Sequence, residues 1–298
     1  MLQFQPPGFG HKVIQTSLGV MVYYTQTHAP WLMTEIDNLP PLIFLHNFGG
    51  GASAYEWSKI YPAFATTHRI LAPDLIGWGE SAHPVRDYQI SDYLTTIAEF
   101  IRQTCRPPVR IVASSLTAAL TIRLAIQYPF LFQSLLLVSP SGFDDFGQGA
   151  GRRIPLPIIN TPLLDSLIYA LGAENGVAVR NFLQSFLFAK SQRVSKEMVE
   201  AYLFSAQQPN AKFAALSFLR GDLYFDLSLY IQQLTIPTVI FWGEKAQFTS
   251  VKLGQRLAKL NERAIRDFHV IPDTGILPHL EMPEIAIALL QRHIRMNQ

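Results

Sequence analysis

The stretch VRIVASSLTAAL at 109–120 carries the clearest candidate nucleophile of the chain, Ser115. Its apolar first half predicts a strand, and its second half predicts a helix that follows without a loop. So sharp a strand-to-helix turn needs small residues on both sides of its centre, because the backbone and the neighbouring helix approach closely. Ala113 and Thr117 hold these positions, and Thr117 is the bulkier. The pattern indicates a serine presented for acyl-transfer chemistry, and simple packing at a strand–helix junction is the alternative interpretation.

The elements that would position Ser115 follow from an alternation of short apolar runs with amphipathic stretches. The central runs are nearly continuous in Val, Ile and Leu, as expected for parallel strands covered on both faces. We therefore predict an α/β fold with a mostly parallel central sheet of about eight strands flanked by helices. The capping signal Ser91/Asp92 predicts one helix start. The strand candidates are 19–26, 41–46, 68–73, 109–114, 134–139, 237–242 and 264–271, and the helix candidates are 91–105, 116–128, 250–260 and 282–296.

Residues 144–225 interrupt this alternation. They contain helix-like stretches, such as TPLLDSLIYALG and VRNFLQSFLFAK, and no good strand run. The alternation resumes at Ile236. The simplest organisation is an α/β core formed by 1–143 and 226–298, with a helical cap inserted at 144–225.

Two polar turns precede the Ser115 turn along the chain. LIFLHNFGGGASAYEW at 42–57 places a His-Asn-Phe sequence and three glycines after a predicted strand. RILAPDLIGWGESAHP at 69–84 places an Asp, a Gly-x-Gly turn and a Ser after the next. Order and spacing together resemble the α/β-hydrolase superfamily over nearly the whole chain. More narrowly, these sequence motifs are similar to those of the epoxide-hydrolase and ester-hydrolase-like branch.

The resemblance implies a set of functional positions. Members of the superfamily stabilise the oxyanion with two backbone N–H groups, which map to Phe48 and Leu116. Their triad acid follows the strand that is TVIFW here, and that position is Ala246. Their base precedes the last helix, where DTGILPHLEMPE places Ile276. The chain thus resembles a serine hydrolase in which the acid and base positions are vacated.

Nearby residues provide candidate substitutes. His279 lies three residues after Ile276, although relatives often carry a structural His there, and a three-residue shift redirects a side chain. Glu244 could replace the acid or be a solvated loop charge. Asp144 and Asp145 lie near an alternative acid position and could instead cap or hinge the insertion. His46 is interpreted as a structural imidazole.

The bulk composition excludes several classes of function. With 298 residues, 49% of them hydrophobic, the chain can bury a large core. A formal net charge of +2 without a Lys/Arg run gives no footprint for nucleic acid. The single Cys105 and an N-terminus unlike a secretory signal predict a cytoplasmic protein. Three prolines and Asp165 within 154–173 argue against a transmembrane segment, but peripheral membrane contact is compatible with its apolar character.

Three hypotheses follow from these residues, and none involves a cofactor or a metal. A serine hydroxyl without a base is a poor nucleophile at neutral pH, so the first is a non-catalytic or very weakly active binder of an apolar small molecule or a protein partner between core and cap. The second is a serine hydrolase for an ester or acyl substrate that uses Ser115 with a base such as His279. The third is a membrane-surface or assembly factor that uses the cap. Whether the chain is an enzyme is left open, and the vacated positions argue against ordinary ester hydrolysis.

Overall fold

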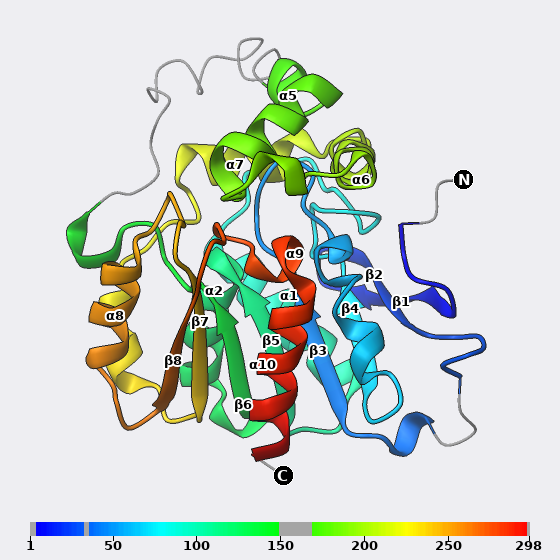
Figure 1. The fold of residues 1–298 in the computed structure, drawn as a ribbon. Helices are drawn as coiled ribbons and strands as arrows, with labels where there is room; N and C mark the ends of the chain where they lie inside the picture. The colour runs from blue at the N-terminus through cyan, green and yellow to red at the C-terminus, as the bar shows by residue number, and fades with distance from the viewer. Residues whose placement is uncertain (1–3, 33–35, 149–168, 297–298) are drawn as a thin grey trace.

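The computed structural model describes residues 4–32, 36–148 and 169–296, and it is built on one eight-stranded sheet (Figure 1). The strand order is β1-β2-β4-β3-β5-β6-β7-β8. β1 and β2 pair antiparallel, β2 pairs antiparallel with β4, and the other pairs are parallel. This confirms the predicted fold class. The strands are β1 (Phe9–Thr16), β2 (Gly19–Gln26), β3 (Pro41–Leu45), β4 (Arg69–Pro73), β5 (Val109–Ser114), β6 (Phe132–Val138), β7 (Thr238–Gly243) and β8 (Ile265–Ile271).

Seven of these strands were predicted within two residues at each end, but β1 was missed. β1 reads FGHKVIQT, and its central side chains are exposed because it is an edge strand. With His, Lys and Gln among few apolar residues, it lacks the continuous apolar run by which the inner strands were found. A turn of two residues joins it to β2.

The helices lie on both faces of the sheet (Figure 1). One correction concerns α1, which begins at Ile90 because Gln89 is its N-cap and Asp92 closes the capping box. Ser91 therefore lies inside the helix rather than at its start. The helices are α1 (Ile90–Thr104), α2 (Ser115–Gln127), α5 (Gly176–Phe182), α6 (Lys196–Ala206), α7 (Lys212–Arg220), α8 (Val251–Lys259), α9 (Pro278–Glu281) and α10 (Pro283–Met296).

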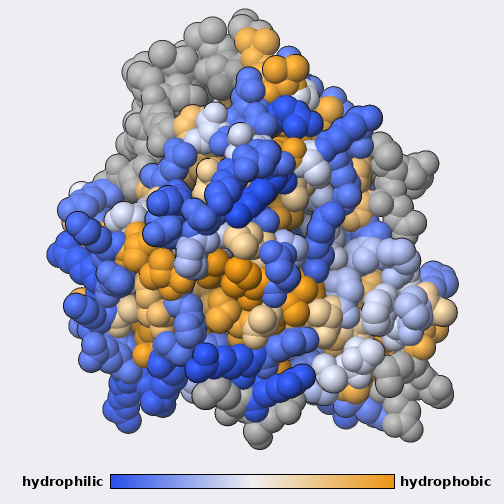
Figure 2. All heavy atoms as spheres, in the orientation of Figure 1, coloured by the Kyte–Doolittle hydropathy of each residue, from blue (hydrophilic) through white to orange (hydrophobic). Residues whose placement is uncertain are grey.

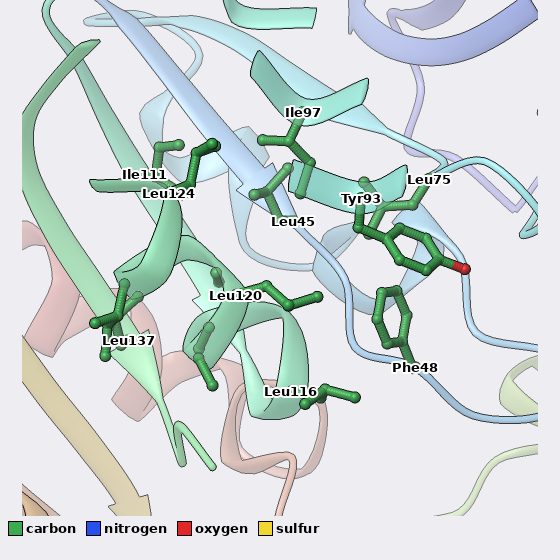
Figure 3. Close-up of a cluster of buried hydrophobic side chains, with 14 of the residues drawn as sticks. Leu45, Phe48, Leu75, Tyr93, Ile97, Ile111, Leu116, Leu120, Leu124 and Leu137 are labelled. Atoms are coloured by element: carbon green, nitrogen blue, oxygen red, sulfur yellow. The ribbon is translucent and has the colours of Figure 1, made fainter. Parts of the chain in front are cut away.

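Alternate side chains of the inner strands enter two separate cores. On β5, Ile111 belongs to the core shared with α1, α2 and α8, whereas Val112 belongs to the core shared with α10. Figure 3 shows the first core, where Leu120 and Leu124 of α2 lie with Leu45 of β3. Both faces of the strand are thus covered, which explains its continuous apolar sequence and fixes the place where it ends.

The chain between β6 and β7 contributes α5, α6 and α7, which Figure 1 shows above the carboxyl ends of the sheet strands. Phe143 and Phe225 form an isolated parallel bridge where this segment leaves and rejoins the sheet. The described part of the segment contributes no strand to the sheet. Treating 144–225 as a cap stays a prediction, and residues 149–168, which include most of TPLLDSLIYALG, lie outside the described residues.

No helix within the described ranges is long and apolar enough to cross a bilayer. On the face shown in Figure 2, hydrophobic residues gather across the middle, and hydrophilic residues dominate below and to the left.

Candidate functional site

Ser115 is the first residue of α2 and follows β5 directly. Its φ of 53° places it in the left-handed region, where a residue with a Cβ is strained. Ala113 and Thr117 on its two sides are fully buried, which explains why small residues are needed here. The structure thus forms the strained strand-to-helix turn that the sequence predicted around Ser115.

Ser115 lines a cavity of about 360 Å³. The cavity wall is mainly aromatic and aliphatic and includes Phe143, Phe182, Phe186, Phe218, Phe248 and Ile276. Loops that follow strands of the sheet and segments of the 144–225 insertion contribute to this wall together. None of the lining residues in the described ranges is Asp, Glu, His, Lys, Arg or Cys. Ser115 therefore opens into a largely apolar space in which tyrosine is the only ionisable residue type among the described lining residues.

Two lining residues keep buried polar atoms without a hydrogen-bond partner in the described structure. These atoms are Asn47 Oδ1 and the Tyr202 hydroxyl. Burial raises the pKa of Tyr202 well above its usual value of 10, so the hydroxyl stays protonated at neutral pH. A buried polar group without a partner costs free energy, and a polar ligand atom is one way to satisfy it.

Ala246 stands where the family resemblance predicts the triad acid, and this correspondence stays a prediction. It lies shortly after β7, is partly buried, and packs against apolar side chains of two cores. Its loop is close to the loop of Ile276: a Cβ at Gly243 would lie 1.7 Å from the Gly275 carbonyl oxygen. Glu244, the acid two residues before Ala246 in the sequence, accepts the Asp273 N–H at 3.1 Å on the exposed side of this loop. Glu244 therefore has its own partner at the surface.

Ile276, where the family resemblance predicts the base, forms part of the cavity wall. Its side chain is only 2% exposed. Its N–H donates to the carbonyl of Leu187 at 3.0 Å, which ties this loop to the insertion. The loops that carry Ala246 and Ile276 thus lie side by side, and Ile276 lines the cavity. Their methyl and sec-butyl groups stand where the resemblance predicts a carboxylate and an imidazole.

His279 does not point to Ser115 in this structure. Its Nε2 lies 2.7 Å from Glu56 Oε1, and its ring stacks on Trp57 with 3.8 Å between ring centroids. The side chains of His279 and Glu56 are both fully buried. None of the hydrogen bonds found among the described residues involves the Ser115 hydroxyl. His279 is therefore engaged with a buried acid on a neighbouring segment.

Glu56 is a buried acid that the sequence reading missed. Its carboxylate accepts the Asn47 N–H at 2.9 Å and the Ser114 hydroxyl, in addition to its contact with His279. It thereby joins the loop after β3, the end of β5 and α9. The one signal in the sequence was an isolated acid between two aromatic residues, Tyr55 and Trp57.

The two predicted oxyanion donors lie next to the cavity. Phe48 lines the cavity, and the centroid of its ring lies 4.4 Å from that of Tyr93. Figure 3 shows these two rings side by side. Leu116 is the second residue of α2, where backbone N–H groups have no partner within the helix. The Asn47–Glu56 bond fixes the backbone just before Phe48. Phe48 thus lies at the cavity and Leu116 directly follows Ser115, and their roles as oxyanion donors stay a prediction.

His46 has two partners on the backbone. Its Nδ1 lies 2.7 Å from the Asn47 carbonyl, and its Nε2 accepts the Leu75 N–H at 2.9 Å. This pattern requires a neutral ring with the proton on Nδ1. Burial lowers the pKa of His46 to about 4, which agrees with the neutral form. The imidazole therefore joins two loops.

Asp145 also binds locally rather than in the cavity. It accepts the Ser141 hydroxyl at 2.6 Å, the Gly142 N–H at 3.1 Å and the Leu227 N–H at 2.9 Å. These bonds join the segment that leaves β6 to the segment that returns toward β7. Asp144 is exposed, at the start of a short 3-10 turn. Neither carboxylate lines the Ser115 cavity.

Comparison with known proteins places this geometry in a family. The model of the alpha/beta hydrolase family matches residues 42–288, and the chain belongs to this family. An uncharacterised protein of Mycobacterium tuberculosis is 23% identical over 262 residues, covering 85% of this chain and 74% of that protein. Lipase 1 of Psychrobacter immobilis is 25% identical over 245 residues, covering 81% and 72%.

Solved structures share the fold at low sequence identity. A serine hydrolase involved in carbazole degradation superposes with a TM-score of 0.74 at 17% identity, covering 97% of this chain and 99% of the other. The meta-cleavage product hydrolase of Pseudomonas fluorescens gives a TM-score of 0.74 at 18% identity, covering 98% and 100%. These likenesses show the α/β-hydrolase fold, and the chemistry of this chain has to be argued from its own residues.

Proposed function

We propose that this protein binds an apolar small molecule in the cavity beside Ser115 and does not hydrolyse it by ordinary serine catalysis. The observation that carries the proposal is the cavity wall, whose described residues include no acid, no imidazole and no amine. Tyrosine hydroxyls remain, and burial raises the pKa of Tyr169 and Tyr202 well above the usual value, so neither can act as a base at neutral pH.

The energetics of the missing base support binding rather than turnover. A serine hydroxyl attacks at a useful rate only when a base removes its proton during the attack. Loss of triad members costs on the order of 10⁴–10⁶ in kcat, and the loss is not additive. The buried Ile276 side chain contributes apolar surface at the point where a hydrolase needs a proton acceptor.

The shape and polarity of the cavity indicate the class of ligand. A volume of about 360 Å³ lies within the usual range for small-molecule sites. Its apolar wall fits a hydrocarbon or aromatic body. The backbone donors predicted at Phe48 and Leu116 favour an oxygen acceptor at the Ser115 end. A carbonyl-bearing apolar molecule satisfies both, and the lipase name of one relative agrees with an acyl chain as ligand.

Binding and turnover can be measured separately on the same protein. A fluorescent fatty acid whose emission depends on polarity is titrated against the wild type, Ser115→Ala and Ala215→Phe. Ala215 lines the cavity and is 3% exposed, so a phenyl group there occupies ligand space. We expect saturable binding by the wild type and Ser115→Ala, and at least tenfold weaker binding by Ala215→Phe.

The matched control is Val177→Phe, which adds a phenyl group at a side chain 69% exposed and outside the cavity wall. It is expected to bind as the wild type does. Equal affinity of Ala215→Phe and the wild type would show that the fatty acid binds elsewhere, which contradicts the proposal. Binding by the wild type together with Ser115-dependent release of product would replace the proposal with a hydrolase.

A serine hydrolase remains the second candidate because one observation favours it. Ser115 keeps the positive φ of a nucleophile turn, which has a strain cost and is not needed to line a cavity. The candidate base, His279, would first have to leave Glu56, which it faces at 2.7 Å. Labelling of Ser115 by a fluorophosphonate in the wild type, lost in His279→Gln, would support this candidate.

A further inference from the structure

A cluster of metal-ligating side chains lies apart from the Ser115 cavity. Within the described ranges, Asp267, His269 and His293 bring three ligand atoms together. Asp267 and His269 are two positions apart on β8, so their side chains project from the same face. His293 reaches them from α10, which Figure 1 shows in red, and β8 is the last strand of the sheet. None of the three residues lines the cavity.

The three ligand atoms converge on one point. His269 Nε2 lies 2.7 Å from His293 Nε2 and 3.0 Å from Asp267 Oδ2, and His293 Nε2 lies 3.8 Å from the same oxygen. A tetrahedral ion with bonds of about 2.0 Å separates two of its ligands by about 3.3 Å. The observed separations lie on both sides of that value. Small rotations of the three side chains would therefore place them around one ion.

Hydrogen bonds alone do not satisfy all three of these side-chain atoms at once. Each neutral imidazole nitrogen carries either a proton or a lone pair. If His269 Nε2 is protonated, its one proton must be divided between His293 and Asp267. If it is not, its lone pair faces the carboxylate oxygen at 3.0 Å. A divalent cation at the centre accepts a lone pair from all three atoms at once.

We propose that Asp267, His269 and His293 form a Zn²⁺ site that connects the edge strand β8 to the C-terminal helix α10. Two imidazoles and one carboxylate are a common zinc ligand set, with water or another small ligand completing the tetrahedron. One carboxylate and two neutral rings leave one positive charge on the complex, which a bound anion or hydroxide would balance.

The surroundings hold the rings and leave an opening for the fourth ligand. The Phe241 ring stacks on His269 at 5.6 Å and meets His293 edge-on at 5.9 Å. The His293 side chain is 5% exposed, whereas that of Asp267 is 40% exposed. Solvent therefore reaches the cluster from the Asp267 side.

The test is Zn²⁺ binding to untagged full-length protein, measured by competition with a chromophoric chelator. We expect one equivalent of Zn²⁺ bound by the wild type and none at this site in His269→Gln or His293→Gln. Asp267→Asn keeps the shape and is expected to weaken binding at least tenfold. His11→Gln, which alters an exposed histidine on β1, is the matched control and is expected to bind as the wild type does.

Two further measurements keep the test independent of folding. Circular dichroism of each apo variant establishes that it is folded before the titration. Cobalt(II) is expected to give the intense visible bands of a tetrahedral site in the wild type alone. Because only the folded state presents the site, Zn²⁺ at one hundred times Kd is expected to raise the Tm by about 4 °C. No bound equivalent in the wild type, or equal binding by folded His269→Gln, would overturn the site and leave a hydrogen-bonded cluster only.

Discussion

Restoring the two vacated positions together is the most informative perturbation of the site. The change is Ala246→Asp with Ile276→His in one protein. If the turn at Ser115 and the donors at Phe48 and Leu116 are otherwise competent, the double variant regains a complete triad. Because triad loss costs on the order of 10⁴–10⁶ in kcat, we expect kcat/KM for a short acyl ester to rise by at least about 10³-fold. Each single change is expected to give less than about tenfold, because the groups act as a unit.

The structure also predicts the cost of this change. Ile276 is 2% exposed, so exchanging it for a polar ring is expected to lower the free energy of unfolding by about 2–4 kcal/mol. Ala246 is partly buried, and a carboxylate there has no partner until the imidazole is present. We therefore expect the double variant to be more stable than the sum of the two single changes would suggest, because only there does the carboxylate meet its imidazole. Urea unfolding of the four proteins gives this coupling energy.

The assay is hydrolysis of p-nitrophenyl butyrate below the Tm of each variant. The control adds Ser115→Ala to the double variant, and this is expected to return the rate to the wild-type value. A double variant that is folded, as judged by near-ultraviolet circular dichroism, and yet no faster than the wild type would refute the reasoning. The vacated side chains would then not be what separates this chain from a hydrolase.

Three other predictions follow from the buried polar groups. Glu56→Gln removes the charge that joins Asn47, Ser114 and His279, so urea unfolding is expected to show a loss of about 3 kcal/mol, against less than about 0.5 kcal/mol for the exposed control Glu244→Gln. Tyr202→Phe deletes a hydroxyl without a partner, so stability is expected to stay within about 0.5 kcal/mol while affinity for a carbonyl-bearing ligand changes; a loss above 2 kcal/mol would contradict this. Burial lowers the pKa of His46 to about 4, and the unfolded ring binds a proton below about pH 6.5, so stability is expected to be full above pH 6.5 and to fall by up to about 3 kcal/mol toward pH 4, with a smaller slope in His46→Gln.

The fold could be predicted where the sequence carries a strong periodic signal. The inner strands are covered on both faces, so they are continuously apolar and were located within two residues. β1 escaped because an edge strand needs only a partial apolar face. The start of α1 was misplaced by one residue and its N-cap by two, because Gln89, a weaker capping residue than Ser or Asp, closes the box with Asp92.

In the candidate site, too, residues within local sequence patterns could be predicted and residues that act through distant contacts could not. Ser115, Ala246 and Ile276 could be named from the sequence because a turn and two loops resemble a family pattern in the same register, and their roles stay predictions. Glu56 was missed because its partners are 9, 58 and 223 residues away along the chain. Contacts between distant segments form only when the fold brings them together, and no local pattern records them.

The zinc ligands proposed above were missed for the same reason. His269 and His293 are 24 residues apart and lie on a strand and a helix, outside the short ligand spacings of sequence motifs. The sequence reading accordingly included no metal. Their convergence depends on the packing of α10 against the sheet.

The central claim, binding without turnover, is tested most directly by the fate of one long-chain acyl ester. The ester is incubated with excess wild-type protein, the protein is separated from free ligand, and the extracted ligand is identified by mass spectrometry. We predict intact ester, bound one to one, and no more free acid than Ser115→Ala produces. Conversion of the bound ester to acid and alcohol by the wild type, abolished by Ser115→Ala, would contradict the claim.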